Sequence, residues 1–394
     1  MSFKRNLPVM YAMAVLQGMI FYGPIATLYR KAAGVSVFQI SQIEVVSLIL
    51  CVALEVPWGM LADRIGYKRT LLISCGLYFV SKIVFWRADG YLMFLIERVI
   101  LAVAVTGISG VDTSILYLSS GEVGARRAFG IYNNCNIIGL LLASGVYALF
   151  IGEDYRLAGL LTVFSYGLAA ALALLLREVK PDAPARRAPG DFARLLRGLL
   201  RDRRLLMLLA GVSLLNESQQ MVTVFLSQLQ YVRAGIAPRA MGVIYLVMTL
   251  VGLLGGLSDR LTRRVGQRRF GVVLFALCAA AFAALAASGQ AWVSVAGVLV
   301  ARGSFSLLQP LQMEAQNSRV HTGDRATALS LNALLMNGVA IPVNLALGGA
   351  ADVRLPLSLG LAAGLCAAGL WLFRRALGGA RMPDALYVEP EHLL

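Results

Sequence analysis

A charged, glycine-containing stretch occurs twice in this chain, each time directly after a long apolar run. The first copy reads Gly59-Met-Leu-Ala-Asp63-Arg64-Ile-Gly66-Tyr-Lys68-Arg69. The second copy reads Gly255-Gly-Leu-Ser-Asp259-Arg260 and resumes, after four extra residues, as Gly266-Gln-Arg268-Arg269. Beyond each copy an arginine lies within an apolar run and is followed by an acid, as Arg98 and Asp112 in one case and Arg302 and Glu314 in the other. This internal repeat predicts two related halves.

The composition is that of a membrane protein. Of the 394 residues, 58% are apolar and 14% are charged, whereas soluble domains have about 45–50% apolar and about 25% charged residues. One membrane-spanning helix takes about 20 apolar residues. The apolar runs predict twelve spans, at residues 8–28, 38–60, 71–88, 91–118, 128–151, 157–176, 205–230, 240–258, 270–288, 292–317, 327–350 and 355–373. The predicted fold is an all-α membrane protein of twelve transmembrane helices in two pseudo-symmetric six-helix bundles.

A polar segment with three prolines and repeated arginines separates the two groups of spans. We therefore expect a first bundle at residues 1–176, a cytoplasmic linker at residues 177–204 and a second bundle at residues 205–394, which ends in a short cytoplasmic tail. Of the 36 Lys and Arg residues, 26 fall in loops on the side of the N-terminus, 7 fall in the other loops or, as Arg87, directly beside one, and 3 lie deeper within spans. This bias places both termini in the cytoplasm. Arg30 and Lys31 fall on the outer side and do not fit the bias.

The net charge of +15 would suggest nucleic acid as a partner for a soluble protein, but here the basic residues lie between spans, and we expect no nucleic-acid partner. The five cysteines lie in apolar runs without paired spacing, and the two histidines are far apart. No metal site, disulfide framework or cofactor is therefore expected. The sequence also contains no Gly-Lys dipeptide, which excludes a phosphate-binding P-loop.

The first copy of the repeat resembles the loop signature of the major facilitator superfamily at Gly59, Leu61, Asp63, Arg64, Gly66, Lys68 and Arg69. The resemblance, which covers essentially the whole chain and is strongest to bacterial multidrug and small-solute efflux members, implies a monomer in the cytoplasmic membrane. It also implies a central cavity that opens alternately to either side and is lined by the first, fourth, seventh and tenth spans. One departure concerns the fifth span, which lacks the proline of the antiporter motif.

The repeated loop predicts a gating latch. Gly59 and Gly66 would allow a short turn, Asp63 could accept hydrogen bonds from a helix N-terminus, and Lys68 and Arg69 could pair with Asp112 or Glu314. Arg64, Asp259 and Arg260 belong to the same predicted device. Such a network would close the cytoplasmic side and break when that side opens. The alternative is that these charges only set the topology.

Four charged residues fall at a similar depth, near the outer ends of their predicted spans. They are Glu44, Lys82, Glu97 and Arg98. Because a charge within a bilayer costs about 2.5–3.5 kcal/mol on insertion scales, each should have a partner. We expect a structural ion-pair cluster. A role in coupling or substrate binding, mainly through Arg98, is the alternative.

Glu217 lies near the middle of the seventh span, in a polar turn with Asn216 and Gln220, and no basic residue shares its helix at that depth. It is the predicted site of proton coupling or cation recognition. The alternatives are a neutral acid bonded to a neighbouring helix, or an ion pair with Arg302. Gln17 and Tyr22 are further polar candidates on the first span.

These features together predict a secondary active transporter that moves a small organic solute by alternating access, with proton-coupled efflux as the preferred mode. Facilitative or symport uptake of a small metabolite is an alternative within the same class. A polytopic membrane enzyme is an alternative from another class, but no catalytic constellation supports it, and the chain is not expected to be an enzyme.

Overall fold

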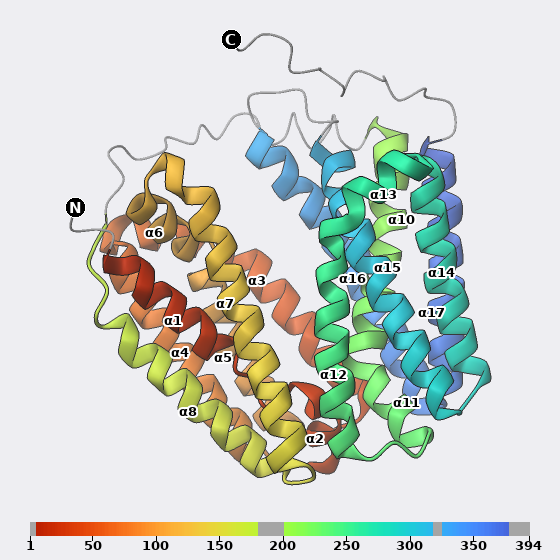
Figure 1. Ribbon diagram of the computed structural model, residues 1–394, viewed down its shortest axis with the longest axis horizontal. Coiled ribbons are helices and arrows are strands. Elements are labelled where there is room, and N and C mark those ends of the chain that lie inside the picture. Colours follow the sequence, from red (N-terminus) through yellow and green to blue (C-terminus); the bar gives the residue numbers. More distant parts are fainter. Residues whose placement is uncertain (1–4, 180–200, 318–324, 378–394) are drawn as a thin grey trace.

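The computed structural model describes residues 5–179, 201–317 and 325–377, and these residues form helices and short connections without any strand (Figure 1). The first half contains α1 (Asn6–Gly18), a 3-10 turn η2 (Gly23–Ile25), α2 (Ala26–Ala32), α3 (Val37–Ile65), α4 (Tyr67–Arg87), α5 (Gly90–Ile108), α6 (Val111–Ser120), α7 (Glu122–Val146), a π-helical turn η3 (Tyr147–Ile151) and α8 (Tyr155–Ala173).

The second half is built from the same kinds of elements, with its short turns at other places. It contains α10 (Arg203–Gln220), a π-helical turn η4 (Met221–Leu226), α11 (Ser227–Arg233), α12 (Pro238–Gly252), a 3-10 turn η5 (Leu253–Leu257), α13 (Ser258–Val265), α14 (Gln267–Ala287), α15 (Ala291–Asn317), α16 (Arg325–Val353) and α17 (Leu355–Leu377). Most of the predicted linker, residues 180–200, lies outside the described residues, so the proposed domain division stays a prediction.

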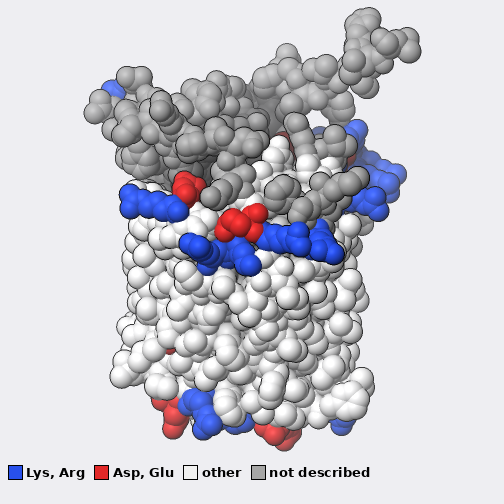
Figure 2. Space-filling model, turned by 90° about the vertical axis from the view of Figure 1, so that its left-hand side faces the viewer, with Lys and Arg blue, Asp and Glu red and all other residues white. Residues whose placement is uncertain are grey.

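The described helices have the lengths and surface of a membrane bundle. Eleven helical segments are long and apolar enough to cross a bilayer. The remaining predicted span, the seventh, is the helical segment α10–η4–α11, whose middle turn carries Asn216, Glu217, Gln219 and Gln220. On the face shown in Figure 2, a broad belt with almost no charged side chains lies between two charged rims. Large apolar side chains such as Phe150 and Leu92 are exposed, as expected for residues that face lipid tails.

Two predicted features of the helices need revision. The fourth span is not one continuous helix, because it breaks between α5 and α6 at Gly110, whose φ of +81° favours glycine. Gly66 makes the turn between α3 and α4, with a φ of +95°, and Gly266 makes the corresponding turn with a φ of +85°. Gly59, in contrast, lies within α3 and makes no turn.

The two halves meet at the end of the bundle opposite the linker. In Figure 1 the ribbons of the halves lie close together around α2, α11 and α12 and diverge towards the end where α10 begins and α17 ends. We call these the far end and the linker end. Within the described residues, the hydrogen bonds between the two halves lie at the far end. The residues that form them from the second half are Gln228, Arg239 and Asp352.

The contact between α3 and α16 shows how closely the halves approach there. Asp352 accepts hydrogen bonds from the backbone N–H groups of Val37 and Phe38, at 2.8 and 2.9 Å, and so caps the N-terminus of α3 from the other half. A Cβ atom on Gly348 would lie 2.7 Å from the Cβ atom of Ser41. A glycine is therefore required at this contact for the far end to close.

Candidate transport site

The first half encloses the predicted ion-pair cluster. Arg98 of α5 forms an ion pair with Glu44 of α3. Lys82 of α4 lies 3.8 Å from Glu97 of α5, and their side chains are only 3% and 1% exposed. The Lys82 ammonium group also donates a hydrogen bond of 2.8 Å to the Tyr22 hydroxyl. The depth argument from the sequence thus identified residues that the fold brings together, and Tyr22 lies inside this cluster.

Aromatic rings surround the cationic groups of the cluster. The Lys82 ammonium lies 5.0 Å from the ring centre of Tyr78 and 5.4 Å from that of Tyr166. Tyr22 stacks on Phe85 with ring centres 4.0 Å apart. Ring faces carry partial negative charge and stabilise a desolvated cation. These contacts, with the ion pairs, explain how several charges are accommodated in the membrane interior.

Arg30 is a member of this cluster that the sequence analysis missed. It was assigned to an outer loop, but the first helical span bends at η2 and continues beyond residue 28 to the end of α2 at Ala32, where Arg30 is buried. Its guanidinium lies 4.0 Å from Glu44 and 5.7 Å from the ring centre of Phe85, and the residue is 5% exposed. The one available signal was that Arg30 did not fit the charge bias of the loops.

Glu217 of α10 occupies a different environment in the second half. The Asn344 side-chain amide, on α16, donates a hydrogen bond of 2.9 Å to the Glu217 carboxyl group. Within the described residues Glu217 takes part in no ion pair, so the alternative of a pair with Arg302 is not observed. The observed contact is the bond to a neighbouring helix.

The polar turn around Glu217 is tied to the adjacent helices. The Asn216 amide donates to Gln312 of α15 at 3.1 Å, whereas Gln220 is exposed. The π-helical turn η4 follows directly after Gln220. Such turns loosen the regular helical pattern and are frequent at functional sites. Gln17, on α1, contacts Cys75 within the first half instead, with its amide 3.5 Å from the sulfur atom.

Arg302 of α15 lies against α12 of the second half. A Cβ atom on Gly252 would be 3.0 Å from a terminal nitrogen of Arg302, which shows that the guanidinium packs on the glycine backbone. Tyr245, about two turns earlier on α12, is close enough to interact with the charge of Arg302. The same tyrosine ring lies beside Gly23 of the first half. Arg302 therefore sits near the place where the halves meet.

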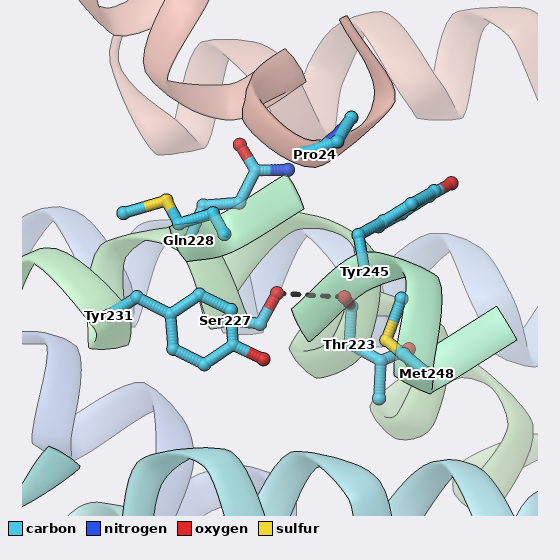
Figure 3. A pocket seen from close by; sticks show the side chains of 8 residues that line it. Pro24, Thr223, Ser227, Gln228, Tyr231, Tyr245 and Met248 are labelled. Carbon is cyan, nitrogen blue, oxygen red and sulfur yellow. Dashed lines mark hydrogen bonds between the residues drawn. The ribbon is translucent and has the colours of Figure 1, made fainter. Parts of the chain in front are cut away.

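A small pocket adjoins this meeting place at the closed end. It is lined by Pro24 from the first half and by Thr223, Ser227, Gln228, Tyr231, Met241, Tyr245 and Met248 from the second half. Figure 3 shows Gln228 extending towards the first-half ribbon and Ser227 donating to Thr223. The Gln228 carbonyl oxygen accepts from the backbone N–H groups of Thr27 and Leu28, at 2.7 and 3.3 Å. Gln228 therefore both lines the pocket and bridges the two halves.

The predicted latch pairs are absent in this conformation. Among residues 5–179, 201–317 and 325–377, no ion pair joins Lys68 or Arg69 to Asp112 or Glu314. Asp112 instead accepts a hydrogen bond from the N–H of Thr113 in the first turn of α6. Because the halves diverge at the linker end, a latch that closes this end would be open here. The latch stays a prediction for another conformation.

The turn motif itself is organised differently from the prediction. The carboxylate that caps the N-terminus of α4 belongs to Glu178, which accepts from the Lys68 N–H at 3.1 Å. Asp63 and Arg64 are exposed near the C-terminal end of α3, so Asp63 does not cap that helix start. In the second copy, Asp259 pairs with Arg263 one helical turn away at 2.8 Å, and Arg260 is exposed.

Solved structures with a similar fold are membrane transporters. The nucleoside transporter NupG matches with a TM-score of 0.78 and 15% sequence identity, over 96% of this chain and 100% of its own. The POT family transporter PepTSo matches with a TM-score of 0.73 and 14% identity, over 96% of this chain and 99% of its own. A bacterial homologue of the human lysosomal transporter Spinster, in an inward-facing and unoccupied conformation, matches with a TM-score of 0.68 and 16% identity, over 95% of this chain and 93% of its own.

At these identities the likeness shows the fold alone. A search of the curated proteins found no match to this chain. The sequence model of the Major Facilitator Superfamily, however, matches residues 9–345. That range includes both copies of the loop motif, the ion-pair cluster and Glu217. The chain therefore belongs to the Major Facilitator Superfamily and is a secondary transporter of small solutes rather than an enzyme.

Proposed function

We propose that this transporter couples the movement of a small organic solute to protons, with Glu217 as the group that binds and releases the proton, and that it works in the direction of export. The observation that carries the proposal is the environment of Glu217. It is a half-buried carboxyl group near the middle of the seventh span, and it accepts a hydrogen bond from the side-chain amide of Asn344.

The contrast with the first half supports this assignment. Glu44 and Glu97 are each held by basic side chains, so protonating either acid would break a buried ion pair. Breaking such a pair is strongly destabilising. The bond from Asn344 to Glu217 can persist in both protonation states, because an amide N–H can donate to a carboxylate oxygen or to the carbonyl oxygen of a neutral acid. Glu217 can therefore exchange a proton at a smaller structural cost.

The predicted topology determines the side of the membrane to which this conformation is closed. If the linker end faces the cytoplasm, the conformation described here is closed towards the outside by the Gln228 and Asp352 contacts. Labelling tests this orientation. An impermeant thiol reagent applied to intact cells should modify Gln290→Cys at the far end and spare Arg264→Cys at the linker end, and the reverse pattern would mean that the topology is inverted.

The test of proton coupling uses proteoliposomes that contain a pH-sensitive dye. A panel of sugars, nucleosides, amino acids, organic acids and amphiphilic cations is screened for solutes that cause proton movement with the wild type. For each such solute, Glu217→Gln should retain solute exchange but lose accumulation driven by a pH gradient. Glu55→Gln is a matched control, because Glu55 is an exposed acid in α3 and should behave as the wild type.

Two outcomes would contradict the proposal. If Glu217→Gln transports solute against its gradient as well as the wild type, Glu217 is not the proton site. Export by antiport further requires that solute and protons move in opposite directions in vesicles of known orientation. Movement in the same direction would instead support uptake by symport.

A further inference from the structure

Arg302 is a charged group within the membrane that forms no ion pair with any acid among the residues that the structure describes. Within the described ranges, its Nε atom is buried without a hydrogen-bond partner. The side chain as a whole remains partly exposed. A charged group at this depth is expected to face water or a partner of opposite charge.

The first half shows what a structural arginine looks like in this fold. Arg98 occupies the matching place in the repeat, and Glu44 of α3 neutralises it. The element that corresponds to α3 is α12, and its sequence from Pro238 to Gly252 contains no acid. The second half thus has the arginine of the repeat, but α12, the helix that corresponds to α3, contains no acid that could pair with it.

The other acids described in the second half are engaged elsewhere or lie away from Arg302. Glu217 is bonded to Asn344, Asp352 caps α3 and Asp202 caps the start of α10. Asp259 pairs with Arg263 on α13, and Glu314 is exposed three helical turns further along α15. The guanidinium of Arg302 packs against Gly252, and Tyr245 lies near it. A planar guanidinium and a hydroxyl group are the donors that typically recognise an oxyanion.

We propose that Arg302, assisted by Tyr245, binds the anionic group of the transported solute, a carboxylate or a phosphate. The inference rests on the proposed function, because it names the substrate class for the same transporter. The anion would supply the negative charge that the described residues do not place beside Arg302. It would do so at the meeting point of the two halves, where a bound solute can influence both.

The test measures binding to purified protein and requires no gradient. Thermal stability is recorded at low ionic strength with three anions and their neutral counterparts, namely benzoate and benzamide, glucose 6-phosphate and glucose, and uridine monophosphate and uridine. At least one anion should raise the melting temperature of the wild type in a concentration-dependent way, and its neutral counterpart should not. Stabilisation by benzoate alone indicates a carboxylate site, and stabilisation by the phosphates indicates a phosphate site.

The variants decide whether Arg302 is responsible. Arg302→Gln should weaken binding of the stabilising anion at least tenfold, and Arg302→Lys, which keeps the charge but loses the planar fork, should weaken it less. Arg374→Gln removes a positive charge from an exposed position on α17 and should bind as the wild type. If Arg302→Gln does not fold, the comparison of the wild type with Arg302→Lys still tests the assignment.

Three results would overturn the inference. They are stabilisation of the wild type by none of the anions, equal stabilisation by the neutral counterparts, and unchanged anion binding in Arg302→Gln or, where that variant does not fold, in Arg302→Lys. Failure of the proton proposal is recognised separately. Glu217→Gln should still bind the anion, because Glu217 does not contact Arg302. Whether that variant loses or keeps pH-driven transport therefore tests the proton proposal and does not change the conclusion about anion binding at Arg302.

Discussion

Removing the cap that Asp352 places on α3 should open the far end. The carboxylate accepts hydrogen bonds from the N–H groups of Val37 and Phe38 across the boundary between the halves. Both N–H groups belong to the first turn of α3, where no intrahelical acceptor is available and where negative charge is favoured. These bonds stabilise the conformation in which the far end is closed, and they must be lost when it opens.

The expected loss of free energy on removing the cap follows from the number and type of hydrogen bonds that Asp352 accepts. A hydrogen bond to a charged group contributes about 1.5–3 kcal/mol, and the lower end applies because Asp352 is exposed. Asp352→Asn keeps one acceptor oxygen and loses the charge, so we expect a loss of about 1.5 kcal/mol, or about tenfold in the ratio of far-end-closed to far-end-open molecules. Asp352→Ala removes both bonds, and the expected loss is about 3 kcal/mol.

Spin-label distances measure this ratio. Labels at Arg126→Cys and Arg264→Cys report the separation of the halves at the linker end, where both residues are exposed. In the Asp352 variants the short-distance population should grow, because the linker end closes when the far end opens. Asp89→Asn is the matched control, since Asp89 precedes α5 but makes no side-chain cap bond. Unchanged distance distributions in both Asp352 variants would refute the role of the cap.

Two further predictions concern packing and buried charge. Gly348→Ala should shift the same spin-label distances towards the far-end-open state, because the new Cβ would lie 2.7 Å from the Cβ atom of Ser41. Gly349→Ala is the control and should leave the distances unchanged, because its Cβ would contact Phe38 at an ordinary 3.6 Å. Lys82→Met should lower unfolding stability by about 3–5 kcal/mol, because it leaves Glu97 buried without its cation. The double variant Lys82→Met with Glu97→Gln should recover a large part of the lost unfolding stability in thermal or denaturant unfolding. If the stability changes of the two single variants simply add up in the double variant, the two residues do not interact.

The helices and the ion pairs within the first half could be predicted from the sequence, because both depend on local rules. Long apolar runs determine the spans, and the depth of a charge within a span follows from the rise of about 1.5 Å per residue. Depth and charge alone group Glu44, Lys82, Glu97 and Arg98, and in the fold these residues form two ion pairs. The tenth span and the turn at Gly66 follow from the same kind of reasoning.

The contacts that depend on how the chain bends or how the halves meet were not predicted. Arg30 joins the cluster only because η2 redirects the end of the first span. Gln228 and Asp352 bridge the halves, and their partners are backbone N–H groups, which carry no signature in the sequence. The latch from Lys68 to Asp112 was predicted from charge complementarity, which does not specify the conformation in which a pair forms.

The two halves share a repeat but use their buried charges differently. In the first half, Glu44 and Glu97 are both neutralised by basic side chains within the same bundle. Pairs of this kind remain intact when a bundle rotates as a rigid body, so they give a proton or a solute little influence over the conformation. In the second half, Glu217 and Arg302 are both within the membrane but are not paired with each other.

An unpaired acid and an unpaired base each have a charge that a ligand can change, by delivering a proton to the one or an anion to the other. A ligand can shift a conformational equilibrium only by the difference in its binding free energy between the states. Tyr245 lies beside Arg302 and against Gly23 of the first half, so the surroundings of the arginine must change when the halves separate at the far end. We therefore expect mutations at Arg302 and Glu217 to alter coupling with modest effects on stability, and mutations at Lys82 and Glu97 to do the reverse.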